Sequence, residues 1–300
     1  MSVEDPVIIT CAISGAIANR DQCPAIPYTP EEYAAEARRI VDEGGVHIHI
    51  HARRPDGTPS YEVEDFLAIR DAIRAAVSDA VIINFSTGTV GVPVAKRIAY
   101  LEAGRPSVAA LNMGSMNYAK YSRSRKDFVF KFVFANPFEE IVELLEAMRR
   151  LGIKPEHECF DVGHVGSLAP LVDMGLLEAP LHADFVMGVV GGIPASARNL
   201  AAMADNLAEV PGAAGPGAKH HWGVIGIGRD QWMLVAAALT LGGSIRVGLE
   251  DNFYLPDGSM ARSNGELVAK ARRMTEDAGR RPATVEEARE LLAIPVEAPA

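Results

Sequence analysis

Short apolar runs alternate along the chain with segments whose apolar residues have helical spacing. Residues 7–13 (VIITCAI) are rich in β-branched side chains and end at Ser14 and Gly15, which is typical of a strand followed by a turn. Further runs predict strands at 46–50, 81–85, 108–111, 158–162, 185–190, 222–227 and 244–248. An additional apolar run at 128–134 lies outside this series.

The segments between these runs carry helix signals. Thr29 is a capping residue, Pro30 occupies the first helical position, and two acids follow in the first turn. Residues 137–151 begin with acids and end with Arg149 and Arg150, an order that suits the helix dipole. The tail at about 261–292 predicts two helices joined at 279–282, which extend the last helix or form an oligomer contact.

Strands that alternate with helices predict parallel β-structure with crossover helices. Eight such units in about 250 residues predict a (β/α)8 TIM barrel. We therefore expect residues 1–300 to form a single domain with a C-terminal helical extension. An open doubly wound sheet is the alternative that the periodicity leaves open.

The composition, 48% hydrophobic and 23% charged, is that of a globular protein and excludes a disordered chain. The 29 Lys and Arg residues against 39 Asp and Glu give a net charge of −10, which argues against nonspecific nucleic-acid binding. No apolar stretch reaches the ~20 residues of a membrane span, and Glu4 and Asp5 stand where a signal peptide would be basic. The three cysteines form no CxxC pair, so we expect a cytoplasmic protein.

Three histidines alternate along the second predicted strand. Alternation places His47, His49 and His51 on one face, where buried imidazoles need partners. One interpretation is a divalent-metal site, most simply zinc, and the alternative is a hydrogen-bonded polar layer inside the barrel. His49 and His51 are nearest the carboxyl end of the strand, where barrel sites lie, so His47 is expected to be structural.

Adjacent acids follow the eighth predicted strand. Glu250 is a candidate third metal ligand, which would complete a His₂Glu set with an open coordination position. Asp251 is then a candidate general base, tuned by Arg246. The alternative is that these acids cap the next helix or form surface ion pairs.

Hydrogen-bonding groups also follow the third and fourth strands. Ser86, Thr87, Gly88 and Asn112 can hold a small carboxylate through side-chain and backbone donors, and ordinary turn chemistry is the alternative. After the seventh strand, Gly226, Gly228 and Arg229 suit a phosphate-bearing cofactor, although their spacing is not that of a dinucleotide fingerprint. His164 follows the fifth strand and is a candidate to line the same site; the other histidines and Cys11 are interpreted as structural.

The sequence resembles the β-keto acid cleavage enzyme family from about residue 8 to residue 292. The motifs that carry the resemblance are ITCAISGA (9–16), PYTPEE (27–32), HIHARRPDG (49–57), NFSTG (84–88), LNMGSMN (111–117), FDVGH (160–164), GIGRDQ (226–231) and RVGLEDN (246–252). The resemblance implies a (β/α)8 barrel with zinc held by His49, His51 and Glu250. It also implies that Arg246 works with Asp251 as the base, and that Ser86 binds or polarises the substrate.

The reaction that this resemblance implies condenses a β-keto acid with acetyl-CoA to give acetoacetate and a new acyl-CoA. It further implies a homotetramer. A family member holds its substrate's ammonium group with a first-loop glutamate, and the matching position here is Ile17, which favours a less polar side group. Other functions left open are a metal-dependent aldolase or lyase, a zinc hydrolase that needs no CoA, and a non-catalytic ligand-binding barrel.

Overall fold

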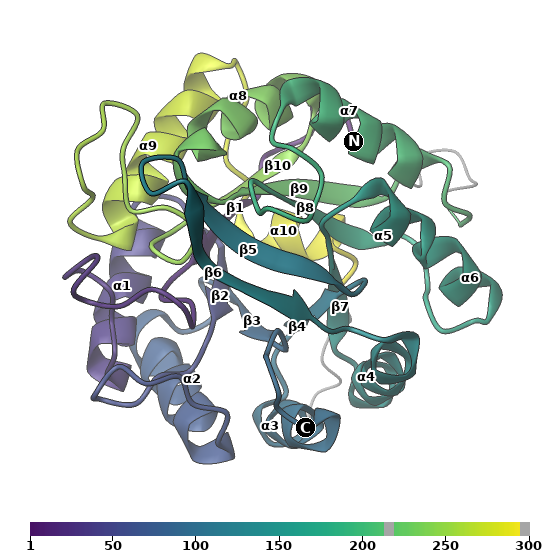
Figure 1. The fold of residues 1–300 in the computed structure, drawn as a ribbon, viewed down its shortest axis with the longest axis horizontal. Helices are drawn as coiled ribbons and strands as arrows, with labels where there is room; N and C mark the ends of the chain where they lie inside the picture. Colours follow the sequence, from purple (N-terminus) through teal and green to yellow (C-terminus); the bar gives the residue numbers. More distant parts are fainter. Residues whose placement is uncertain (213–218, 295–300) are drawn as a thin grey trace.

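The computed structural model describes residues 1–212 and 219–294. Within these ranges eight parallel strands close into a barrel in the order β1-β10-β9-β8-β7-β4-β3-β2 (Figure 1). The barrel strands are β1 (Ile9–Ala12), β2 (His47–Ile50), β3 (Ile82–Ser86), β4 (Val108–Asn112), β7 (Lys154–Cys159), β8 (His182–Met187), β9 (His221–Gly226) and β10 (Ser244–Val247). The predicted (β/α)8 barrel is confirmed, and the open sheet is excluded because each of the eight strands pairs with two neighbours, β1 closing the ring between β2 and β10.

Helices surround the barrel (Figure 1). They are α1 (Pro30–Asp42), α2 (Val63–Val77), α3 (Val94–Gly104), α4 (Phe138–Leu151), α5 (Val162–Gly166), α6 (Leu168–Asp173), α7 (Ala197–Ala208), α8 (Gln231–Leu241) and α9 (Asn264–Asp277), with a short 3₁₀ turn η1 (Gly228–Asp230) before α8. The first helix begins as predicted, because Thr29 and Glu32 cap each other's backbone and Pro30 follows the cap. None of the helices in the described ranges is long and apolar enough to cross a membrane.

Two strands lie earlier in the chain than the apolar runs predict. The strand expected at 158–162 is wrong: β7 spans Lys154–Cys159, and Asp161 caps α5 instead. Likewise the strand expected at 185–190 begins at His182 and ends at Met187. Both errors have one cause, because the inward positions of these strands carry polar residues and so do not read as an apolar run.

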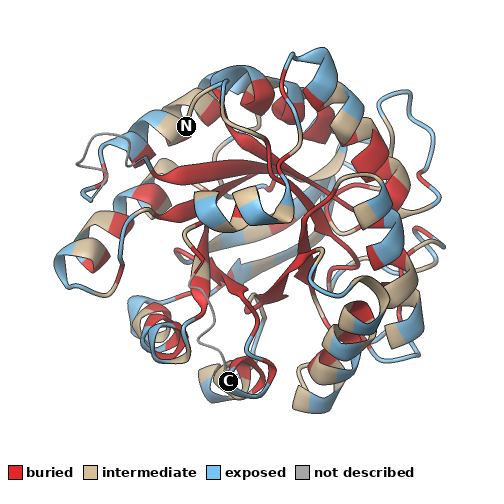
Figure 2. Cartoon of the chain, turned by 180° about the vertical axis from the view of Figure 1, so that it is seen from behind, coloured by how far each residue is buried: buried red, intermediate tan, exposed pale blue. Residues whose placement is uncertain are grey.

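The C-terminal tail divides between two roles. α9 connects β10 back to α1 and β1, so it is the eighth helix of the barrel. The shorter α10 (Val285–Leu291) packs with Ala283 and Leu292 against Ile8, Val46, Ile82 and Val108, at the beginnings of the first four barrel strands. α10 therefore closes the N-terminal end of the barrel, where Figure 2 shows it crossing the centre.

An antiparallel hairpin lies across the opposite end of the barrel (Figure 1). Its strands are β5 (Met116–Ser122) and β6 (Asp127–Phe134), and only the second corresponds to a predicted apolar run. Ala119 and Val190 exchange backbone hydrogen bonds of 3.2 and 3.3 Å, which fix the hairpin to the segment after β8. This contact needs a glycine at position 191, because a Cβ there would lie 1.8 Å from the carbonyl oxygen of Asn117.

The barrel strands are buried (Figure 2), and many of their buried residues are polar or charged. Side chains from strands that are not neighbours meet in the interior: Asn84 Nδ2 donates to Glu156 Oε2 at 2.6 Å, and Arg246 Nη1 donates to Glu158 Oε1 at 3.1 Å. Buried charged groups are tolerated when such partners surround them. This interior holds the candidate functional residues.

Candidate active site

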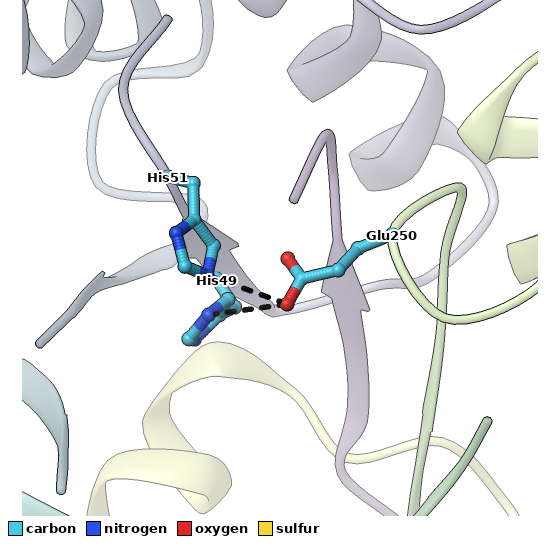
Figure 3. A group of neighbouring side chains, drawn as sticks. All are labelled: His49, His51 and Glu250. Carbon is cyan, nitrogen blue, oxygen red and sulfur yellow. Dashed lines mark ion pairs between the residues drawn. The ribbon is translucent and has the colours of Figure 1, made fainter. Parts of the chain in front are cut away.

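Three of the predicted residues meet at the carboxyl ends of β2 and β10. His51 Nε2 lies 3.4 Å and His49 Nε2 lies 3.7 Å from the same oxygen of Glu250, Oε1 (Figure 3). The centres of the two imidazole rings are 5.3 Å apart, and the ring planes are inclined at 63°. His49, His51 and Glu250 will be called the triad. Their side chains converge although 199 residues (250 − 51) separate His51 from Glu250 in the sequence.

The loop after β1 holds Glu250 in this position. Gly15 has a φ of +59°, and a Cβ on it would stand 2.7 Å from Cγ of Glu250. The backbone of Glu250 donates to the carbonyl oxygen of Ala12 at 3.2 Å. The acid is therefore packed against β1 rather than turned outward, and the alternative of a surface ion pair or helix cap is not what the structure shows.

The triad has the properties of a divalent-metal site. Donor atoms around a tetrahedral zinc with bonds of ~2.0–2.1 Å lie roughly 3.3 Å apart, close to the distances measured here. Oε2 of Glu250 is buried and has no hydrogen-bond partner among the described residues, so a ligand-free site would leave it unsatisfied. Burial, followed by the charge of Arg246, keeps the pKa of His49 well below its ordinary value, and the neutral ring is the form that binds a metal.

Arg246 connects three acids at the same end of the barrel. Its Nε and Nη2 donate to the two carboxylate oxygens of Asp251 at 2.9 and 3.0 Å, while Nη2 also donates to Glu250 Oε1 at 2.9 Å. Nη1 donates to Glu158. The predicted pairing of Arg246 with Asp251 is thus present, in the bidentate form that fixes a carboxylate most firmly.

The two neighbouring acids differ in their acidity. Burial opposes the ionisation of Glu250, but His51, His49 and Arg246 together hold its pKa below the ordinary value. Burial raises the pKa of Asp251 to about 6, against the pull of Arg246 and with a further rise from the charge of Glu250. Glu250 is thereby suited to remain an anionic ligand, whereas Asp251 is suited to exchange a proton near neutral pH.

The predicted substrate-binding residues lie on the adjoining strands. Ser86 ends β3 beside His51, because Ile50 pairs with Phe85, and its Oγ accepts a hydrogen bond from Gly88 N at 3.2 Å. Asn112 ends β4 and is buried. Thr87 is also buried, and its hydroxyl donates to the carbonyl oxygen of Ala110. Thr87 therefore donates its hydroxyl proton within the protein, whereas Ser86 uses its hydroxyl oxygen as an acceptor.

The remaining predicted positions lie at the same end. Gly226 closes β9, and the backbone of Gly228 donates to the carbonyl oxygen of Asp251 at 2.8 Å. Arg229 is exposed and its guanidinium lies 4.9 Å from the ring centre of Tyr254. Ile17, in the loop after β1, is 59% exposed.

Three buried acids were not singled out by the sequence: Glu156, Glu158 and Asp184. Burial raises the pKa of Glu158 to about 7. The missed signal is the alternation in KPEHEC, which places Glu156 and Glu158 on one face of β7. Donor atoms of Glu156, His182 and Asp184 also lie within 4.8 Å of one another.

The remaining histidines are buried, apart from His164. His47 Nδ1 is 3.0 Å from the hydroxyl of Thr10, one level deeper in the barrel than the triad. The rest of the buried set is His157, His182, His220 and His221. His164 is half-buried, and its Nδ1 accepts from the backbone of Phe160 at 3.2 Å. Cys11 is fully buried in the core.

Comparison with known proteins gives a consistent picture. The sequence profile of the family described as "beta-keto acid cleavage enzyme" matches residues 6–294. A 3-keto-5-aminohexanoate cleavage enzyme of Fusobacterium nucleatum is 36% identical over 290 residues, covering 97% of this chain and 98% of the relative. A 3,5-dioxohexanoate:acetyl-CoA acetone transferase of Paraburkholderia graminis is 35% identical over 309 residues, covering 97% of each.

Among solved structures, ObcA in its binary complex with oxaloacetate is similar in fold. The TM-score is 0.71 at 22% identity, and the match covers 91% of this chain and 68% of that one. At this identity the likeness supports the barrel architecture alone.

Proposed function

The chain belongs to the β-keto acid cleavage enzyme family, and from this premise we propose that it condenses a β-keto acid with acetyl-CoA, giving acetoacetate and a new acyl-CoA. The printed names of two relatives support this: one is a cleavage enzyme of a β-keto acid, and the other transfers to acetyl-CoA. The observation that carries the proposal is the arrangement of Arg246, which holds a candidate metal ligand and a candidate base side by side.

We assign a zinc ion to the triad of His49, His51 and Glu250. A bound zinc supplies Lewis-acid polarisation of the β-keto oxygen, which makes the neighbouring methylene more acidic. Asp251 is placed to act on that methylene, since it follows Glu250 directly in sequence and shares its arginine. A carboxylate with a pKa of about 6 is mostly ionised at neutral pH and is still basic enough to take a proton.

The chain's residues then account for each proton in the reaction. Asp251 takes a proton from the methylene between ketone and carboxylate, and the resulting carbanion attacks the acetyl carbon of acetyl-CoA, which expels CoA thiolate. The thiolate attacks the original ketone carbon and forms R-CO-CoA, while the bond from that carbon to the methylene breaks. Asp251 returns its proton to the acetoacetate carbanion, so the base ends the cycle ionised.

Binding roles follow from position. Ser86 and Asn112 end β3 and β4, the next two strands after β2 in the barrel, and offer a hydroxyl and an amide for the substrate carboxylate, with Thr87 and Gly88 shaping the turn. Gly226, Gly228 and Arg229 remain our prediction for the phosphate-bearing end of CoA. A cytoplasmic homotetramer also remains a prediction, made from the family resemblance and the cysteine pattern.

The test is a panel of β-keto acids, each incubated with and without acetyl-CoA and scored for acetoacetate. Formation of acetoacetate only with acetyl-CoA supports the proposal. Cleavage without acetyl-CoA would instead indicate an aldolase, lyase or hydrolase. Bound metal with no turnover of any β-keto acid would indicate a ligand-binding barrel.

A further inference from the structure

Three aromatic side chains form a surface where the hairpin meets the carboxyl end of the barrel. The rings of Tyr118, Phe134 and Phe160 meet edge to face, with centroids 5.8, 6.2 and 6.1 Å apart. We call these three residues the aromatic face. They pack on Val186 and Ile225, which come from β8 and β9. The hairpin contributes two of the three rings, so its docking on Val190 fixes their position.

The aromatic face adjoins the predicted substrate-binding turn. A Cβ placed on Gly88 would stand 3.7 Å from Cζ of Phe134 and 3.0 Å from Nδ2 of Asn112. One ring of the aromatic face is therefore in contact range of the turn that ends β3.

The aromatic face also adjoins the catalytic acids. Ile225, on which the aromatic face packs, is the register partner of Arg246, and burial followed by the charges of Glu250 and Asp251 raises the pKa of the Tyr118 phenol. The aromatic face thus adjoins the substrate-binding turn through Phe134 and the arginine that holds the acids through Ile225.

Among the described residues, the acids whose charges act on Tyr118 are already paired. They are Glu250, Asp251 and Glu158, and all three accept hydrogen bonds from Arg246. The apolar residues packed with the aromatic face include Val189 and Phe132, and a polar neighbour is His164, whose ring centre lies 6.2 Å from that of Phe160. Ile17, at the first-loop position, is apolar as well. A charged side group would lose its hydration here without compensation.

We propose that the aromatic face binds the side group R of the substrate R-CO-CH₂-COO⁻, and that the preferred R is uncharged and apolar. Tyr118 and Phe134 are then specificity-determining residues supplied by the hairpin. This inference rests on the proposed function, since it names the substrate class of the same site.

Three β-keto acids of similar length test the preference: 3-oxohexanoate with R propyl, 3-oxoadipate with an anionic R, and 5-amino-3-oxohexanoate with a cationic R. Acetoacetate, with R methyl, provides the reference, because acetyl-labelled acetyl-CoA exchanges its label into acetoacetate without net reaction. We expect kcat/KM for 3-oxohexanoate to exceed that of both charged acids by at least about 10-fold.

Phe134→Ala removes the ring next to the turn. We expect the ratio of kcat/KM for 3-oxohexanoate to the rate of acetoacetate label exchange to fall about 10-fold or more, since the exchange needs little side-group contact. Phe134→Leu keeps an apolar side chain and should give a smaller fall, which separates the loss of the ring from misfolding. Phe128→Ala, on the same strand but 42% exposed, is the matched control and should leave the ratio unchanged.

The outcomes are distinct. A preference for either charged acid, or an unchanged ratio in both Phe134 variants, would overturn the inference while label exchange still supports the proposed function. The absence of label exchange and of acetoacetate from every substrate in the wild type would overturn both.

Discussion

Arg246 donates two parallel hydrogen bonds to Asp251, from Nε to Oδ2 at 2.9 Å and from Nη2 to Oδ1 at 3.0 Å. The same guanidinium touches Glu250 and, across the barrel, Glu158. One buried cation thus sets the position of the proposed base and of a proposed metal ligand together. Any change at Arg246 is expected to alter both, so the base is better tested at Asp251 itself.

Asp251→Asn is nearly isosteric and cannot accept the proton. We expect the variant to bind zinc and substrate but to lose roughly 10²–10⁴-fold in turnover, the usual range when a general base is removed. Solvent hydrogen exchange at the substrate methylene should fall in parallel. Exchange at the wild-type rate would show that another group takes the proton.

The triad predicts one zinc per chain at this site. His49→Ala and His51→Ala should each lose zinc and activity, whereas His47→Ala should keep zinc and lose stability, because its ring fills the buried layer beneath and pairs with Thr10. Metal analysis and thermal unfolding of the three purified variants give the answer. Full zinc content in His49→Ala would refute the ligand assignment.

Gly15→Ala tests how Glu250 is held. The added methyl group would stand 2.7 Å from Cγ of Glu250, so the acid must move and zinc affinity should fall about 10-fold or more. Gly152→Ala is the matched control: its φ of +69° imposes similar backbone strain, but no atom lies within 4 Å of the new methyl group. Equal zinc affinity in both variants would mean that Gly15 does not position the ligand.

Ile17→Glu tests the first-loop position. If residue 17 faces the bound side group, a carboxylate there should favour a cationic β-keto acid over a neutral one by ~1–3 kcal/mol, the worth of a close charge-assisted contact. The measurement is the ratio of kcat/KM for 5-amino-3-oxohexanoate and 3-oxohexanoate in the variant and the wild type. An unaltered ratio would place Ile17 outside the substrate's reach.

Acid stability depends on buried histidines. Burial lowers the pKa of His157 to about 3, from about 6.5 in the unfolded chain. The unfolded state therefore binds more protons between these values, and this contribution to stability, complete above pH 6.5, is lost as the pH falls towards 3. His157→Gln keeps a donor for the carbonyl oxygen of His182 and removes the titration. The free energy of unfolding, measured with urea between pH 4 and 7.5, should change less steeply with pH in this variant than in the wild type. The difference should reach up to about 1.4 kcal/mol per pH unit.

The sequence was sufficient for the triad because of where its members stand. The alternating histidines reach the carboxyl end of β2, and the two acids follow the carboxyl end of β10. The closed barrel order places β2 and β10 on either side of β1. Once a barrel is predicted, His49, His51 and Glu250 have to converge. The resemblance to a family then selects zinc and the role of Asp251 from the alternatives.

The sequence was insufficient where polar residues fill the barrel interior. Glu156 and Asp184 point inward from β7 and β8, and their charge hid the first residues of both strands from a search for apolar runs. The first hairpin strand was missed for a similar reason, since MNYAKYS is mostly polar. Its docking depends on a glycine 74 residues later (191 − 117), a long-range contact that local periodicity does not contain.

The short helix α10 fills the end of the barrel at which the strands begin. Substrates therefore enter, and products leave, at the opposite end, across which the hairpin lies. If CoA binds at that end as proposed, it blocks the path to the triad, so the smaller β-keto acid enters first. Acetyl-CoA then stays for both halves of the exchange, and the new thioester leaves before the next turnover. The kinetics should accordingly be ordered rather than ping-pong, an order that follows from the closure of the other end by α10.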